Sequence, residues 1–345
     1  MDLIKKTQDF FRVTRYLIWA YRTGYFLEKG YYKYGIHRLK IKALKKLGFL
    51  RLERIFLCPS YQCNANCPHC YEKFQFEKDK SSLTTEECKI IIDQFKELGG
   101  YFVSFVSGEF IMRADALELI KYCSDKRMVV EVTSNGILLD EKMIDDLKNA
   151  GLTILAVSID SADPNIHDKY RGEGVFAKAA NGLKLAKEKG LKTQIWTYIS
   201  ASNNNELDDI GELGKSLGVD FVLVFFSILA GNLFYKSEEM LSFEQREGIR
   251  NKYFGKYPIL LHHGQESWPC DCGGRELICV KPTGDVTFCP VSPYSYGSIR
   301  QKTLKELLGV VEKDCKKFSH CTGQCIVNFK EYRENCNAKF MYPPK

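Results

Sequence analysis

Residues 52–70 read LERIFLCPSYQCNANCPHC, an apolar run followed at once by a segment rich in cysteine. The run Leu52–Leu57 has the length and composition of a buried strand. Three cysteines follow it with three and then two residues between them: Cys63, Cys67 and Cys70. After this stretch, strand-like runs alternate with helical patterns along most of the chain, and this alternation predicts the fold.

Five more strand-like runs follow the first. They lie at Tyr101–Val106, Val129–Thr133, Ile154–Ile159, Lys192–Ile199 and Asp220–Phe226. Helical patterns follow five of the six runs, at about 84–98, 114–125, 140–150, 175–189 and 205–217. This alternation predicts an α/β fold with parallel strands inside and helices outside. Six units predict an open, partial (β/α)6 TIM-like barrel, whose active site forms at the C-terminal ends of the strands.

The cysteine segment sits where such a site is expected, directly after the first strand. Three thiolates within eight residues suit a single iron–sulfur cluster. They leave one iron without a protein ligand, so that iron is free to bind a substrate or cofactor. A structural zinc site needs four closed ligands, and a zinc site that uses Cys58 as the fourth is the alternative interpretation.

The Cys-x3-Cys-x2-Cys spacing after a first strand resembles the radical S-adenosylmethionine superfamily. The resemblance implies that Cys63, Cys67 and Cys70 hold a [4Fe–4S] cluster whose free iron binds S-adenosylmethionine. One electron then cleaves that cofactor to a 5′-deoxyadenosyl radical, which abstracts hydrogen from a substrate. The resemblance also implies a reducing electron donor such as flavodoxin or ferredoxin.

Segments at the next strand ends resemble the cofactor-binding turns of this superfamily. Ser107-Gly108-Glu109-Phe110 resembles a Gly-Gly-Glu-Pro turn that holds the methionine ammonium, although Ser and Phe replace its first Gly and its Pro. Thr133-Ser134-Asn135-Gly136 resembles a Thr-Asn-Gly turn. Ser158-Ile159-Asp160-Ser161, with His167–Arg171 after it, resembles a pattern of the subgroup that carries C-terminal auxiliary clusters. The resemblance implies cofactor contacts from Ser107, Gly108, Glu109, Asn135, Ser158 and Arg171.

The chain has fourteen cysteines, and eight of them lie within residues 270–336. Clustered cysteines in a reducing compartment more often bind metal than form disulfides. Their spacing resembles the SPASM extension, which houses up to two auxiliary [4Fe–4S] clusters; one or two structural zinc sites are the alternative. Glu312 stands where that pattern has a cysteine, and Cys270 is unassigned. The resemblance implies Cys272, Cys279, Cys289 and Cys325 for the first auxiliary cluster, and Cys315, Cys321 and Cys336 for part of a second.

Charge marks the N-terminal segment. The chain has a formal net charge of +7, yet residues 1–54 hold 14 Lys and Arg against 4 Asp and Glu, an excess of 10. The basic character is therefore local, which argues against nucleic acid as a partner. Two helices are expected there, at 3–23 and 29–48, packed on the barrel; binding to an anionic membrane surface or an acidic peptide leader is the alternative.

Four regions are therefore expected: a basic helical segment at 1–50, the barrel at 51–230, a connecting segment at 231–268 with a helix near 242–254, and a Cys-rich auxiliary domain at 269–345. Charged residues interrupt the N-terminal apolar pattern, so neither a secretory signal nor a membrane span is expected, and the expected location is the cytoplasm.

The leading functional hypothesis is a radical enzyme that modifies a peptide or protein side chain, because net oxidation needs an electron acceptor and auxiliary clusters supply one. A radical enzyme acting on a small molecule in cofactor or metabolite biosynthesis is the alternative within enzymes. An iron–sulfur electron carrier or scaffold without radical chemistry is the alternative of another class.

Overall fold

The structure is a computed structural model that describes residues 52–73, 81–233, 235–253, 256–261, 277–317, 334–335 and 338–341. The expected helices at 3–23 and 29–48 lie outside these residues. So do Cys270, Cys272, Cys321, Cys325 and Cys336.

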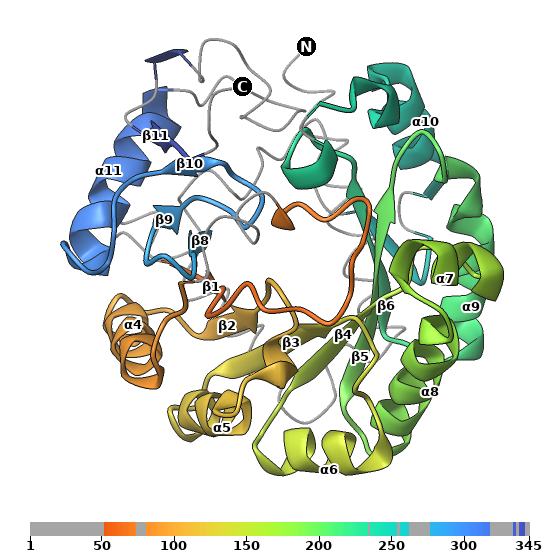
Figure 1. Cartoon of the computed structure of the whole chain (residues 1–345), viewed down its shortest axis with the longest axis horizontal. Helices are drawn as coiled ribbons and strands as arrows, with labels where there is room; N and C mark the ends of the chain where they lie inside the picture. Colours follow the sequence, from red (N-terminus) through yellow and green to blue (C-terminus); the bar gives the residue numbers. More distant parts are fainter. Residues whose placement is uncertain are drawn as a thin grey trace, which may run out of the picture.

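Nine strands of the described chain form one curved sheet with the spatial order β7-β6-β5-β4-β3-β2-β1-β8-β9. All neighbouring strands are parallel except β8 and β9. β7 and β9 are the two ends of the sheet, so the barrel is open (Figure 1). The strands are β1 (Arg54–Leu57), β2 (Phe102–Phe105), β3 (Val129–Ser134), β4 (Ile154–Ser158), β5 (Lys192–Ile199), β6 (Phe221–Phe226), β7 (Ile259–Leu261), β8 (Leu277–Val280) and β9 (Val286–Thr287).

Helices cover the outer side of this arc (Figure 1). The first, α4, begins with a capping box in which Thr84 Oγ1 accepts the Glu87 N–H and Glu87 Oε2 accepts the Thr84 N–H, at 3.1 and 2.8 Å. A glycine with positive φ lies two residues after the last residue of α4, α6, α8 and α9, at Gly99, Gly151, Gly190 and Gly218. The helices are α4 (Thr85–Glu97), α5 (Ala116–Asp125), α6 (Glu141–Asn149), α7 (Pro164–Arg171), α8 (Val175–Glu188), α9 (Leu207–Ser216), α10 (Phe243–Tyr253) and α11 (Leu304–Lys317).

The partial barrel predicted from the sequence is confirmed. The six predicted strand runs contain β1 to β6, apart from Ser134 at the end of β3 and with boundaries differing by a few residues. The five predicted helices correspond to α4, α5, α6, α8 and α9, and the helix expected near 242–254 is α10. The periodicity also explains which face is buried: in β5 the alternate residues Thr193, Ile195, Thr197 and Ile199 are buried, and the residues between them are half-buried.

Strands that follow the sixth unit extend the sheet at both of its edges. β7 adds to β6, and β8 pairs in parallel with β1, with Phe56 opposite Cys279. β8 and β9 pair antiparallel, and the turn between them lies within residues 280–289. The tail then packs beside the first helix, where the Leu304 N–H donates to Gln94 Oε1 at 2.7 Å. A second sheet pairs β10 (Tyr294–Ser295) with β11 (Lys339–Phe340).

Within the described residues, no helix combines the length and the apolar character needed to cross a lipid bilayer.

Candidate functional site

The loop after β1 carries Cys63, Cys67 and Cys70, all half-buried (orange, Figure 1). It crosses the C-terminal end of the strands, where a barrel of this kind places its active site. The Cys70 N–H donates to the Cys67 carbonyl at 3.2 Å, and the Ala65 N–H donates to Cys63 Sγ at 3.4 Å. The three thiols therefore project from one compact loop.

Residues 231–232, which follow β6, contact the backbone of this loop. The Asn232 N–H donates to the Cys70 carbonyl at 3.0 Å, and Asn232 Nδ2 donates to the Cys67 carbonyl at 3.1 Å. Gly231 has a φ of +53°, and a Cβ there would lie 2.2 Å from the Cys70 carbonyl oxygen. Only glycine permits an approach this close with this backbone conformation.

Burial affects the protonation of these thiols in the metal-free chain. Burial is the main cause that raises the pKa of Cys63, and burial raises the pKa of Cys70 to about 12. Both groups are therefore protonated at neutral pH unless a metal displaces the proton. Among the described residues, no three His, Cys, Asp or Glu side chains converge on a point suited to a single metal ion. In a [4Fe–4S] cluster each thiolate binds a different iron, so its ligands stand further apart than those of one ion.

Glu109 lies beside this loop and is 2% exposed. Its Oε2 accepts the Asn135 N–H at 2.7 Å, whereas Oε1 is buried without a hydrogen-bond partner among the described residues. The hydroxyls of Ser107 and Thr133 are likewise buried and unpartnered there. Burial raises the pKa of Glu109 to about 7, against the opposing effect of the Asn135 N–H. Such groups cost stability unless a ligand satisfies them, so this corner fits a bound cation with N–H donors.

Glu109 and Asn135 both contact the cysteine loop. The Glu109 N–H donates to the Gln62 carbonyl at 2.8 Å. Asn135 Nδ2 donates to Asn64 Oδ1 at 2.7 Å and lies 3.8 Å from Cys63 Sγ. The structure therefore brings Glu109 and Asn135 beside the cysteine loop and packs Gly108 against the Gln62 carbonyl; that Ser107, Gly108, Glu109 and Asn135 share a cofactor stays a prediction. Ser158 ends β4 further round the arc, half-buried.

Arg171 has a protein partner in this structure. Its Nε lies 2.7 Å from Asp160 Oδ2, and its Nη2 lies 3.3 Å from His69 Nε2. Although burial acts in the opposite direction on each, the ion pair holds the pKa of Asp160 well below and that of Arg171 well above the usual range. Arg171 was predicted from the sequence to contact the cofactor; that contact stays a prediction, and the structure shows Arg171 anchoring Asp160.

His69 and Asp160 are functional candidates that sequence reasoning missed. His69 lies between Cys67 and Cys70, stacks on the Tyr198 ring at 5.0 Å, and lies 3.4 Å from Asp160 Oδ2. Burial lowers the pKa of His69 to about 4, so its ring is neutral at pH 7. The sequence did carry a signal for His69, since an aromatic, polar residue within the cysteine motif is expected to lie beside whatever the cysteines bind.

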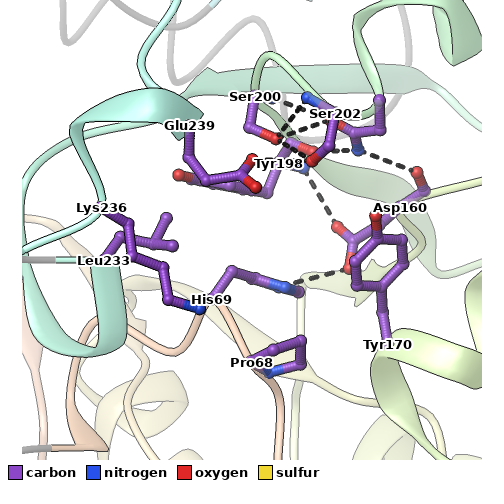
Figure 2. A pocket seen from close by; sticks show the side chains of 11 residues that line it. Pro68, His69, Asp160, Tyr170, Tyr198, Ser200, Ser202, Leu233, Lys236 and Glu239 are labelled. Carbon is purple, nitrogen blue, oxygen red and sulfur yellow. Dashed lines mark hydrogen bonds and ion pairs between the residues drawn. The ribbon is translucent and has the colours of Figure 1, made fainter.

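These side chains line a cavity of about 160 Å³ (Figure 2). The aromatic rings of His69, Tyr170 and Tyr198 form part of its wall, and Figure 2 shows the contact between the His69 ring and the Asp160 carboxylate at one side. Opposite them, Ser202 Oγ donates to Glu239 Oε2 at 2.7 Å. The remaining lining residues are Pro68, Ser200, Asn203, Leu233 and Lys236.

The predicted auxiliary ligands are only partly within the described chain. Cys289 follows β9 and is buried, and Cys315 lies in α11. Cys279 is buried in β8, where its Sγ lies 3.5 Å from the Sγ of Cys58. Cys58, the proposed fourth ligand of the zinc alternative, thus has its thiol against Cys279 in the core. Cys272, Cys321, Cys325 and Cys336 lie outside the described residues.

Comparisons with known proteins define the class. Residues 57–214 match the Radical SAM superfamily. The chain is 27% identical to an AdoMet-dependent heme synthase of Methanosarcina barkeri over 80% of this chain and 88% of that one. It is 24% identical to a PqqA peptide cyclase of Granulibacter bethesdensis over 72% of this chain and 71% of that one.

A solved structure shares the fold. SuiB of Streptococcus suis, bound to its precursor peptide SuiA, matches with a TM-score of 0.66 and 16% identity, covering 91% of this chain and 81% of that one. Residues 57–214 of the chain are therefore a radical SAM domain, and the chain is an enzyme. Its cofactors are those of the radical SAM superfamily, a [4Fe–4S] cluster and S-adenosylmethionine, and the cysteine loop and the unpartnered Glu109 oxygen fit them.

Proposed function

We propose that Cys63, Cys67 and Cys70 hold the [4Fe–4S] cluster and that Glu109 receives the ammonium of S-adenosylmethionine. The single observation that carries this proposal is a buried, unpartnered carboxylate oxygen beside a loop of three half-buried thiols. A reduced cluster held by these cysteines would supply the electron for cleavage of S-adenosylmethionine, and the 5′-deoxyadenosyl radical released would abstract hydrogen from a substrate.

The chain's own groups have separable roles in this proposal. Asn232 and Gly231 fix the backbone of the cluster loop, and Asn135 orients Glu109 through its N–H. Ser107 and Gly108 contribute hydroxyl and backbone groups at the same corner. The cavity walled by His69 and Tyr198 receives the adenosine end, because stacked aromatic rings and nearby polar groups suit a flat heterocycle. Ser158 and Arg171 are the remaining proposed cofactor contacts.

The test is production of 5′-deoxyadenosine by anaerobically reconstituted, dithionite-reduced protein. Wild-type protein should produce it, and Cys63→Ala, Cys67→Ala and Cys70→Ala should each abolish it. Cys58→Ala is the matched control, because that thiol faces Cys279, and it should retain cleavage. Loss of cleavage in Cys58→Ala with the three loop cysteines intact would favour a four-cysteine site. Absence of 5′-deoxyadenosine from wild-type protein under any reductant would favour the electron-carrier alternative.

The substrate class has two candidates. The leading proposal is a peptide or protein side chain, which the similarity to a PqqA peptide cyclase and the fold shared with SuiB support. The second is a tetrapyrrole or another small molecule, and one observation favours it: the match to a heme synthase runs along 88% of that protein. Adding an iron porphyrin to the reduced enzyme tests the second candidate. Tetrapyrrole-dependent stimulation of 5′-deoxyadenosine formation, with a changed porphyrin mass, would rule in the small molecule.

We also propose that residues 269–345 form a SPASM-like domain with auxiliary clusters, using Cys272, Cys279, Cys289 and Cys325 and, for a second cluster, Cys315, Cys321 and Cys336. The hairpin at β8–β9 that leads to Cys289 supports this assignment. The pairing of Cys279 with Cys58 makes Cys279 the member to test first. Cys279→Ala should lower bound iron by about four atoms if Cys279 is a ligand, and should leave iron unchanged if it is a packing residue.

A further inference from the structure

Lys281 carries a positive charge into the interior beside the cysteine loop. It is among the largest fully buried side chains described, at 1% exposed. Its Nζ lies 2.6 Å from Glu72 Oε1, and Glu72 is also buried, at 4% exposed. The same Nζ donates to the carbonyl of Pro290.

The partners of Lys281 come from two distant parts of the chain. Glu72 lies two residues after Cys70, at the end of the loop that carries the first cluster. Pro290 lies one residue after Cys289, the predicted auxiliary ligand at the end of the β8–β9 hairpin. Lys281 itself follows β8, whose pairing with β1 brings the two segments together. One ammonium group therefore contacts the side chain of Glu72 near Cys70 and the backbone carbonyl next to Cys289, and these cysteines are assigned to two different clusters.

A buried ion pair is a costly way to fill space, since apolar side chains of similar volume often stabilise a core as well or better. What an ion pair adds is geometric specificity, because its strength falls when either partner moves. Groups just outside the ligands of a metal site orient those ligands. The position of Lys281, between the two segments and in contact with both, gives it this role toward both at once.

We propose that Lys281 is a positioning residue that holds the segment after Cys70 and the segment after Cys289 at a fixed separation. This inference rests on the proposed clusters for its purpose, because electron exchange between two clusters depends steeply on the distance between them. The link itself belongs to the protein and exists without metal. It is therefore testable on the metal-free chain.

The experiment is hydrogen exchange on the metal-free full chain, comparing the peptides that contain residues 70–73 and 288–292. Lys281→Met should speed exchange in both peptides together, by about tenfold, as expected when a local opening loses its main restraint. Glu72→Gln leaves the Lys281 ammonium buried without its opposite charge, so it should also speed exchange in both peptides. Lys302→Met, an exposed lysine after the same hairpin, is the matched control and should change neither.

Faster exchange in only one of the two peptides, or an equal rise throughout the barrel, would overturn the proposal. If Lys281→Met does not fold, the neutral pair Glu72→Gln/Lys281→Gln replaces it, because no lone buried charge remains. Its shorter residue 281 should still release the peptide that contains 288–292, and unchanged exchange there would count against the link.

A second readout uses the reconstituted holoenzyme. Magnetic coupling between the two reduced clusters, seen as broadening of their electron paramagnetic resonance signals, should weaken in Lys281→Met and stay intact in Lys302→Met. Unaltered coupling in a Lys281→Met protein that binds wild-type amounts of iron would contradict a positioning role. If wild-type protein assembles no cluster at all, the proposed function fails, whereas the exchange result still decides whether Lys281 joins the two segments.

Discussion

At the scale of single residues, the site contains two buried carboxylates in different surroundings. One has an oxygen without a protein partner in the described part of the chain, and the other is fully paired with protein groups. Glu109 has one hydrogen-bonded carboxylate oxygen and one unpartnered one. Asp160 has both oxygens in use, because Oδ1 accepts the Tyr198 N–H at 3.1 Å and Oδ2 faces Arg171. The first carboxylate is therefore assigned to binding and the second to positioning, and the two predict different consequences of substitution.

Glu109 predicts a pH-dependent affinity for S-adenosylmethionine. Its pKa is raised to about 7, so below that pH the group is a neutral acid that cannot pair with an ammonium. The affinity of reconstituted protein should therefore rise about tenfold between about pH 6 and pH 8, measured by calorimetric titration. Glu109→Gln removes the titrating group and serves as the reference for ionisation of the ligand itself. An identical pH profile in both proteins would sink this assignment.

The same raised pKa has the opposite effect on the ligand-free fold. The folded protein binds more protons at Glu109 than the unfolded chain does between the ordinary carboxyl pKa of 4.5 and about 7. Stability contributed by this group is therefore present below the ordinary pKa and lost as pH rises through about 7. Glu109→Gln should flatten that part of the stability profile, as measured by urea unfolding of metal-free protein.

Asp160 predicts a loss of stability. Asp160→Asn leaves Arg171 buried without its opposite charge, which should lower the free energy of unfolding by about 3–5 kcal/mol. Urea unfolding of the metal-free protein measures it. Asp146→Asn breaks the surface ion pair with Lys142 and should leave the unfolding midpoint unchanged. Equal effects from both substitutions would show that burial of the Asp160 pair confers no special stability.

At the scale of elements, the repeat of strand and helix is what made the fold predictable. Apolar runs followed by helical periods located β1 to β6 and their helices, because each unit buries its own faces locally. The parallel pairing of β8 with β1 was not predicted, since a four-residue run says nothing about which distant edge it joins. The partner of Arg171 was missed for the same reason: the pattern located the side chain near the site, but only the folded chain shows Asp160 facing it.

The segment after β6 supplies a prediction at this scale. Gly231→Ala would place a methyl group against the Cys70 carbonyl in a backbone conformation that alanine rarely adopts. The loop must shift, so iron retained after reconstitution should fall and stability should drop by about 2 kcal/mol. Gly248→Ala in α10 is the control, because a Cβ there meets nothing within 4 Å. Full iron content in Gly231→Ala would show that the loop does not need this contact.

At the scale of the whole molecule, the barrel and the C-terminal region are predicted to bind separate iron–sulfur clusters, each of which can be removed without the other. A Cys63/Cys67/Cys70→Ala protein should lose about four iron atoms and all cleavage of S-adenosylmethionine. Cys289→Ala should lose a different set of about four and still release 5′-deoxyadenosine in the absence of substrate turnover. Iron analysis with product chromatography measures both. Parallel loss of cleavage in the two proteins would indicate one interdependent site.

The hydrogen bonds from Asn232 to the Cys67 and Cys70 carbonyls have a consequence for when the cluster can be inserted. The ribosome delivers the cysteines long before the asparagine that holds them, with some 165 residues of chain between Cys67 and Asn232. During that interval the nascent chain contains the three cysteines but lacks the asparagine that fixes their loop. Insertion of iron and sulfide by the assembly machinery is therefore expected to follow completion of the sixth repeat, which makes metallation a late event in the life of the polypeptide.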